Sequence, residues 1–131
     1  MESESCDWGM LGKVRIVRPA AGGIEAEGRV PRDLELFGDH FPGFPVLPGV
    51  LSLELMKKAA QAWLEYGAPA ATGRLREVRS IKFGAFLRPG DSWRLSLTPR
   101  PGEAQTVFQG RLMQEEKTAV SAVLVFENSA R

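Results

Sequence analysis

The sequence predicts an α+β domain in which one buried helix lies beside about six antiparallel strands. Only residues 48–66 combine sufficient length with an apolar pattern of helical period, and the rest of the chain consists of short alternating runs separated by Gly and Pro turn signals. The length of 131 residues suits one domain, residues 1–131, without repeats or low-complexity tracts. We expect residues 1–10 to be poorly ordered.

Two strands are expected ahead of the helix. Polar and apolar residues alternate over residues 13–17, and again over residues 24–30 after the turn signal Gly22-Gly23. A loop over residues 31–48 then leads into the helix.

The expected helix covers residues 48–66, with Gly67 as its C-cap. Pro48 suits the first helical position, because the N–H that proline lacks would have no partner there. Apolar side chains cover most of the circumference and leave one narrow polar stripe, made of Glu54, Lys57, Lys58, Gln61 and Glu65. A helix this apolar is expected to be largely enclosed.

Four strands are expected after the helix, and each is bounded by turn signals. They cover about 74–87, 92–98, 104–114 and 117–127. The alternation of Trp93, Leu95 and Leu97 is typical of a strand with one buried face.

Composition excludes several classes of function. A net charge of +1 gives no global argument for nucleic acid or a membrane, and no apolar stretch approaches the length of a membrane span. With one histidine and one cysteine, no metal site is expected. The lone Cys6 and the absence of a visible secretion signal favour a reducing cytoplasm.

The most informative segment is residues 40–51, which read His-Phe-Pro-Gly-Phe-Pro-Val-Leu-Pro-Gly-Val-Leu. Its prolines fix their own φ and hold the preceding residues extended, so the loop is stiff. His40 opens this loop, and Glu54 lies on the helix that follows. An imidazole and a carboxyl group held in this way are the groups that general acid–base catalysis uses.

These residues resemble the β-hydroxyacyl-acyl-carrier-protein dehydratases, the FabA/FabZ group of hotdog-fold enzymes. Residues 40–51 match the family pattern throughout, Glu54 holds its acidic position, and residues 83–91 (FGAFLRPGD) match a second, less specific motif. Asp39 departs from the family's usual glycine, and the family's N-terminal Leu-Pro-His-Arg-Tyr-Pro segment is not found. The resemblance implies a hotdog fold, a curved antiparallel sheet wrapped round one central helix.

The resemblance also implies an activity, dehydration of a (3R)-3-hydroxyacyl thioester on acyl-carrier protein to the trans-2-enoyl thioester. His40 would remove the C2 proton, the Gly49 N–H would hold the thioester oxygen and Glu54 would assist departure of the hydroxyl. No cofactor would be needed beyond the carrier's phosphopantetheine. A homodimer or dimer-based oligomer is implied, with the histidine of one protomer meeting the carboxylate of the other.

Each of these residues also has a simpler explanation. Alone, His40 would be a surface histidine, and Asp39 is best explained as a loop cap. Glu54 and Lys58 would make a favourable i,i+4 ion pair without catalysis. The apolar residues of the motif serve either as core or as the wall of an acyl site: Phe41, Phe44, Val46, Leu47 and Val50.

The segment 74–94 is basic. It is either the solvent-exposed face of a sheet or a docking surface for an acidic acyl-carrier protein. The residues expected to dock the carrier are Arg74, Arg76, Arg79 and Lys82. Two other functions stay open, a hotdog acyl-thioesterase and a non-catalytic acyl-carrier-binding subunit. The His-Phe-Pro-Gly loop argues against the thioesterase.

Overall fold

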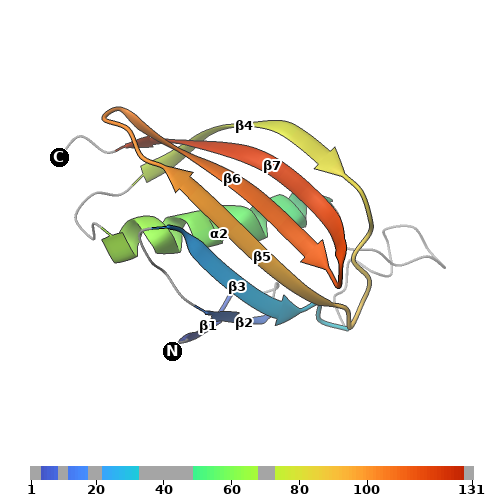
Figure 1. The fold of residues 1–131 in the computed structure, drawn as a ribbon. Coiled ribbons are helices and arrows are strands. Elements are labelled where there is room, and N and C mark those ends of the chain that lie inside the picture. Colours follow the sequence, from blue (N-terminus) through green and yellow to red (C-terminus); the bar gives the residue numbers. More distant parts are fainter. Residues whose placement is uncertain (1–3, 9–11, 18–21, 33–48, 68–72, 129–131) are drawn as a thin grey trace.

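The computed structural model of the protein describes residues 4–8, 12–17, 22–32, 49–67 and 73–128. They form one helix and a seven-stranded antiparallel sheet that curves around it (Figure 1). The elements in chain order are β1 (Glu4–Asp7), β2 (Lys13–Ile16), β3 (Ile24–Arg29), α2 (Gly49–Gly67), β4 (Gly73–Phe83), β5 (Ser92–Arg100), β6 (Gln105–Gln114) and β7 (Lys117–Asn128). Across the sheet the order is β1-β2-β3-β5-β6-β7-β4, so the strand that follows the helix lies at one edge. The α+β prediction is confirmed.

Two predictions about strands are wrong. Residues 4–7 belong to the segment expected to be poorly ordered, yet they form β1 and give the sheet seven strands rather than about six. The reason is backbone pairing: Glu4 lies opposite Ile16 and Asp7 opposite Lys13, so the main chain of β2 supplies the partners. The second error concerns length, because the strand expected to reach residue 87 ends at Phe83.

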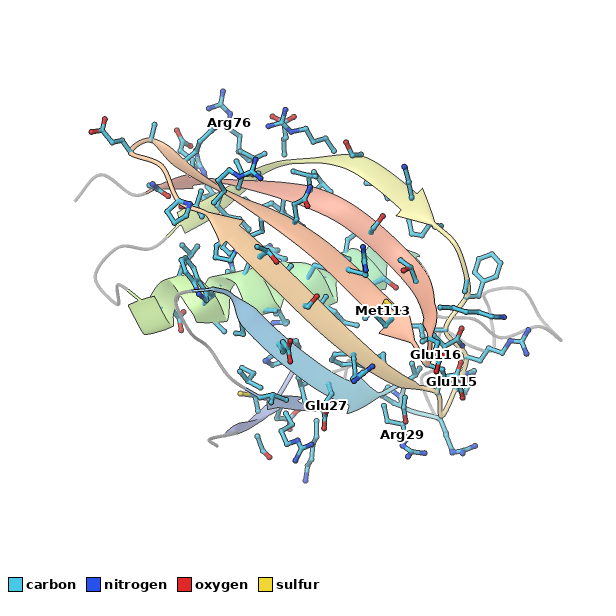
Figure 2. All side chains as sticks on the ribbon, viewed as in Figure 1. Glu27, Arg29, Arg76, Met113, Glu115 and Glu116 are labelled. Atoms are coloured by element: carbon cyan, nitrogen blue, oxygen red, sulfur yellow. The ribbon has the colours of Figure 1, made fainter. Side chains whose placement is uncertain are left out.

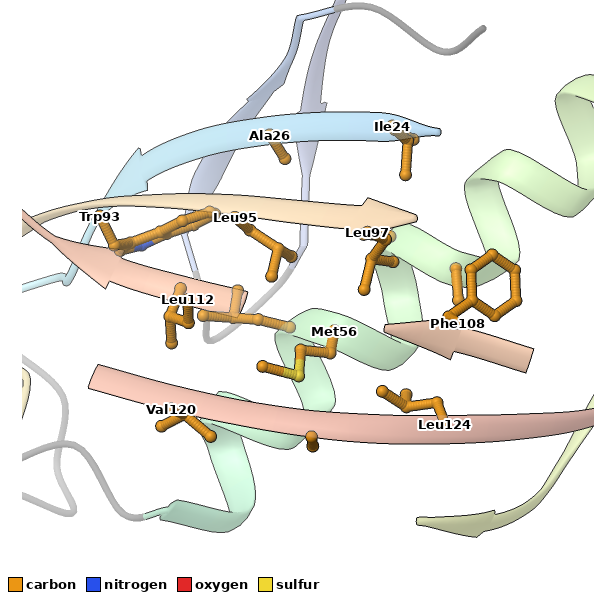
Figure 3. Packing of buried hydrophobic residues seen from close by; sticks show 14 of the residues in the cluster. Ile24, Ala26, Met56, Trp93, Leu95, Leu97, Phe108, Leu112, Val120 and Leu124 are labelled. Carbon is orange, nitrogen blue, oxygen red and sulfur yellow. The ribbon is translucent and has the colours of Figure 1, made fainter. Parts of the chain in front are cut away.

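The core lies between the inner face of the sheet and α2. Met56 projects from the helix into side chains of the central strands, among them Leu97, Leu112 and Leu124 (Figure 3). A Cβ on Gly110 would lie 2.8 Å from Leu97 Cδ2 and 3.0 Å from Met56 Sδ. The close approach of helix and sheet therefore depends on glycine at this position.

Aromatic rings close the core toward the far end of the helix. The rings of Trp63 and Phe108 meet edge to face at 5.6 Å between centroids, and those of Phe108 and Phe126 at 5.5 Å. Such geometries add to the stabilisation that area burial provides. These contacts attach the second half of α2 to strands β6 and β7.

Helix α2 buries one face only. Ser52, Leu55, Met56, Ala59 and Ala60 are buried, whereas the polar residues predicted to form a stripe are half-buried or exposed. The predicted enclosure is therefore only partial in the single chain, where Val50 and Glu65 are exposed. In the described part of the chain, no helix has the length and apolarity needed to cross a membrane.

Candidate functional site

The first turn of α2 begins at Gly49, which is half-buried. The first N–H groups of any α-helix have no partner inside the helix, and the helix dipole places partial positive charge there. A Cβ added at Gly49 would lie 2.7 Å from Phe83 Cε1 and 2.9 Å from Cζ. With the ring in this position, glycine leaves it room, and any larger residue would have to displace the ring of Phe83.

Phe83 reaches the helix because β4 contains a bulge. Between the pairs Arg79–Val123 and Lys82–Ser121, β4 holds one residue more than β7. Ser80, within this bulge, has φ +56°, a left-handed conformation that residues other than glycine rarely adopt. The extra residue reverses the alternation of side chains along the rest of the strand.

The reversal decides which face Phe83 occupies. Phe83 lies opposite Val120, which is buried in the core, and so belongs to the inner face of the sheet. Without the extra residue, Phe83 would point to the outer face and could not contact Gly49. The contact between the end of β4 and the start of α2 is thus a product of strand register.

Exposed apolar side chains occur on both segments that meet at this contact. Among the described residues, the large hydrophobic side chains that remain exposed are Val50 (70%), Phe86 (57%), Phe83 (56%) and Ile81 (40%). Three of them lie within residues 81–86, and the fourth follows Gly49 directly. Of these, Phe83 and Val50 flank Gly49, and exposed apolar groups that meet in this way usually mark a place for a ligand or a partner; Phe86 belongs to a separate turn described below.

Glu54 lies one helical turn after Val50 and is half-buried. Residues four apart share one face of a helix, so its carboxyl group lies on the face that carries the exposed valine. Within the described residues the ion pairs are Arg15–Glu27, Arg74–Glu127 and Arg79–Glu77. The Glu54–Lys58 pair considered above is not among them, which removes the simplest structural explanation of Glu54.

The second motif builds a turn that supports the segment after β4. Asp91 Oδ2 accepts hydrogen bonds from the Arg88 backbone N–H at 2.8 Å and from Gln114 Nε2 at 2.6 Å. Gln114 Nε2 also donates to the Phe86 carbonyl at 3.2 Å, and Gly90 supplies the positive φ of the turn, +85°. Sequence reasoning missed the role of Gln114, because its partners lie 23 and 28 positions away along the chain.

Five predicted site residues lie outside the described residues: His40, Phe41, Phe44, Val46 and Leu47. The structure brings together Gly49, Val50 and Glu54, which share the first two turns of α2. It adds Phe83, which the sequence placed in a motif but gave no role.

The four basic residues predicted to dock a carrier protein are all exposed on the edge strand β4: Arg74, Arg76, Arg79 and Lys82. Two of them already have acidic neighbours, since Arg74 Nη2 lies 3.2 Å from Glu127 Oε1 and Arg79 Nε lies 3.8 Å from Glu77 Oε2. The other two make no ion pair with a described residue, and Arg76 projects outward from the sheet (Figure 2).

Two surface hollows lie away from the helix N-terminus. One, of about 740 Å³, is lined by charged residues of both signs, including the Arg15–Glu27 pair and Glu116 at the β6–β7 turn (Figure 2). The other, of about 490 Å³, covers the outer face of β4 to β7 and is lined mainly by hydroxyl and amide groups with Lys82 and Arg111. In the described part of the chain, no cluster of His, Cys, Asp and Glu is able to hold a metal ion.

Comparison with known proteins gives a family and a fold. Residues 17–123 match the model of the ApeI-like family, described as ApeI dehydratase. The 3-hydroxyacyl-[acyl-carrier-protein] dehydratase FabZ of Ligilactobacillus salivarius strain UCC118 is 40% identical over 76 residues, which are 56% of this chain and 54% of that protein. The chain thus spans about half the length of this curated relative.

Solved structures confirm the hotdog fold. The ApeI:P dehydratase heterocomplex from Xenorhabdus doucetiae superposes with a TM-score of 0.73 at 15% identity, over 98% of this chain and 88% of that chain. A hypothetical thioesterase with coenzyme A from Streptococcus pneumoniae TIGR4 gives 0.75 at 10% identity, over 98% of both chains. Dehydratases and thioesterases thus share this architecture, and the fold alone does not choose between them.

Proposed function

The chain belongs to the ApeI-like dehydratase family, and we propose that it dehydrates (3R)-3-hydroxyacyl-[acyl-carrier-protein] to the trans-2-enoyl thioester in fatty-acid or related acyl-chain biosynthesis. The observation that carries this proposal is the start of α2, where the Gly49 backbone N–H, which has no partner within the helix, lies beside exposed apolar side chains and ahead of the carboxyl group of Glu54. We place the activity in the cytoplasm, in keeping with the single cysteine.

In the proposed reaction His40 removes the proton from C2 of the substrate. The electron pair of the C–H bond moves toward the thioester carbonyl, whose oxygen gains negative charge and accepts a hydrogen bond from the Gly49 N–H. The pair then forms the C2–C3 double bond as the C3–O bond breaks. Glu54 donates its proton to the departing hydroxyl, which leaves as water. No cofactor takes part, because the phosphopantetheine only carries the substrate.

The surroundings of Gly49 suit its proposed role. A backbone N–H at a helix N-terminus combines a free donor with the positive end of the dipole, which favours a developing oxyanion. The missing side chain leaves the peptide group accessible, and Phe83 covers the Cα side of the residue. An acyl chain would therefore meet an apolar surface next to the hydrogen-bond donor.

We propose that the active form is a homodimer or a dimer-based oligomer. Strand β4 ends the sheet, so the backbone groups along its outer edge have no strand partner in the described part of the chain. Ile81 on this strand and Val50 on the helix expose apolar surface that a second copy would cover. Covering Val50 would also enclose Glu54, which shares its face of α2.

The carrier protein would dock on the basic residues of β4. Arg76 and Lys82 are the more effective members of the predicted set, because Arg74 and Arg79 already face carboxylates. A long-range attraction of this kind mainly speeds encounter with an acidic partner.

The test is incubation of the purified protein with a 3-hydroxyacyl carrier protein, followed by mass spectrometry of the acyl group. Loss of water from the intact thioester is the expected result. Release of the free hydroxy acid would instead establish a thioesterase, and binding of the carrier without any change would establish a non-catalytic acyl-carrier-binding subunit.

A further inference from the structure

We propose that Phe83 is a substrate-positioning residue, whose ring holds the acyl thioester against the N-terminus of α2. The inference rests on the proposed dehydratase function and adds a residue to it. Three observations carry it: the register of β4, the contact with Gly49 and the exposure of the ring.

The register of β4 is set by a conformation that has a steric cost. Ser80 has φ +56°, and a non-glycine residue in the left-handed region costs roughly 1–2 kcal/mol. The local result of the bulge is that Phe83 is on the inner face and Lys82 on the outer face. Strain that persists in a strand and aims one aromatic side chain at a helix N-terminus is characteristic of functional sites.

The exposure of Phe83 distinguishes it from the other inner-face aromatics. Phe108 and Phe126 are fully buried, as expected for phenylalanine on the core side of a sheet. Phe83 is 56% exposed although it lies on the same side. One part of its ring contacts Gly49, and the remaining part is available to a ligand.

The position of the ring suits an acyl thioester. The ligand must offer an apolar chain to the ring and a carbonyl oxygen to the donors at the start of α2, and a thioester carries both within a few bonds. The ring fits in this position beside a glycine, since a Cβ at residue 49 would lie 2.7 Å from Cε1 and would displace it. Phe83 and Gly49 therefore act as a pair: the ring borders the path by which the thioester reaches the helix N-terminus, and the glycine leaves room for the ring.

The experiment compares Phe83→Ala, Phe83→Leu and the control Phe86→Ala, using short and long 3-hydroxyacyl N-acetylcysteamine thioesters. Phe86 is a matched control because it is 57% exposed but belongs to the turn held by Gln114. We expect Phe83→Ala to lower kcat/KM about tenfold or more, mainly through KM and most strongly for long chains. Phe83→Leu should restore much of the loss, and Phe86→Ala should leave kcat/KM unchanged.

Two companion measurements separate positioning from other roles. The melting temperature of Phe83→Ala should match that of the wild type, because the ring is more than half exposed, and the oligomeric state should be unchanged, because Ile81 and Val50 are the apolar residues proposed for the interface. Unchanged kcat/KM in Phe83→Ala would overturn the inference. Loss of the oligomer or a fall in melting temperature that parallels the loss of activity would overturn it as well, by assigning the ring to an interface or to the core.

Calorimetric binding of a 3-hydroxyacyl pantetheine amide distinguishes failure of this inference from failure of the proposed function. If the wild type binds this analogue but dehydrates no thioester, the proposed reaction fails, and weaker binding by Phe83→Ala still supports the positioning role. If the wild type dehydrates its substrate and Phe83→Ala binds the analogue equally well, the positioning role fails and the reaction stands.

Discussion

At the scale of single residues, the first two turns of α2 separate into two faces with different tasks. Ser52 is 4% exposed and Leu55 1%, and both face the sheet. Val50 is largely exposed, and Glu54, on the same face, lies at the boundary between the two. A carboxyl group at such a boundary is supported by a packed helix and still accessible to a substrate.

Glu54→Gln tests the proposed acid. The change keeps shape and hydrogen bonding but removes the proton donor, so we expect turnover to fall by about 10²–10⁴-fold. The free energy of unfolding should change by less than about 0.5 kcal/mol, because the residue is only half-buried and makes no ion pair with a described residue. Steady-state kinetics and thermal melts are the measurements. Lys58→Ala is the control: unchanged turnover in both variants would make Glu54 a surface residue without a catalytic role.

At the scale of elements, β4 does more than extend the sheet. Register shifts between Leu75 and Glu77 and between Arg79 and Lys82 each insert a residue relative to β7. The second shift redirects Phe83 toward the helix, and the strand ends immediately afterward. The site thus depends on a local irregularity at the sheet edge, where bulges are common.

Ser80 allows a test of this irregularity. Ser80→Gly should raise the free energy of unfolding by up to about 1 kcal/mol, because glycine adopts a positive φ without steric cost. Ser80→Val should lower it by about 1–2 kcal/mol. Ser96→Gly is the matched control, because Ser96 lies within β5 and does not have a positive φ. Glycine at that position should lower the free energy of unfolding by about 0.5–1 kcal/mol. Denaturant unfolding measures all three, and a destabilised Ser80→Gly would contradict the proposed strain.

At the scale of the whole molecule, the two edges of the sheet differ. Strand β1 has 4 residues, whereas β4 has 11 and lies beside the exposed apolar side chains. A long edge with exposed apolar groups is a template for pairing with another chain, and a short polar edge is a poor one. The expected dimer interface therefore lies at β4 and the start of α2.

Mixed dimers test whether a site takes residues from two protomers. Subunits carrying His40→Ala and subunits carrying Glu54→Gln should each be inactive, and their co-expression should recover about a quarter of the wild-type sites, a statistical estimate for a two-fold interface. Two affinity tags isolate the mixed dimers for assay, and in this purified fraction about half of the wild-type sites should be intact. Inactive mixed dimers would place both residues of a site on one chain.

The docking surface for the carrier also belongs to this scale. Replacing Arg76 and Lys82 together with Ala should raise KM for carrier-bound substrate and leave turnover of a small N-acetylcysteamine thioester nearly unchanged, because surface charges mainly govern encounter. Added salt should act like the substitutions, since screening operates over about 8–10 Å at physiological ionic strength. As a control, Arg100→Ala removes an exposed cation from β5. If neither salt nor the substitutions change carrier binding, the docking surface lies elsewhere on the protein.

The sequence by itself determined the features that depend on local pattern. The helical period predicted α2 to within one residue at each end of its described range, and alternation located six of the strands. The acidic position Glu54 and the glycine at the helix start were readable because the motif is continuous in the sequence. His40 stays a prediction, since it lies outside the described residues.

Only the tertiary structure decided the features that depend on partners distant in sequence. Strand β1 forms because β2 supplies hydrogen bonds, not because its own residues alternate. Leu75, Val78 and Phe83 of β4 all face the core, because each of two extra residues in the strand reverses the alternation, and no local pattern announces either reversal. The contact between Phe83 and Gly49 joins segments 34 positions apart, and it depends on the packing of a strand against a helix.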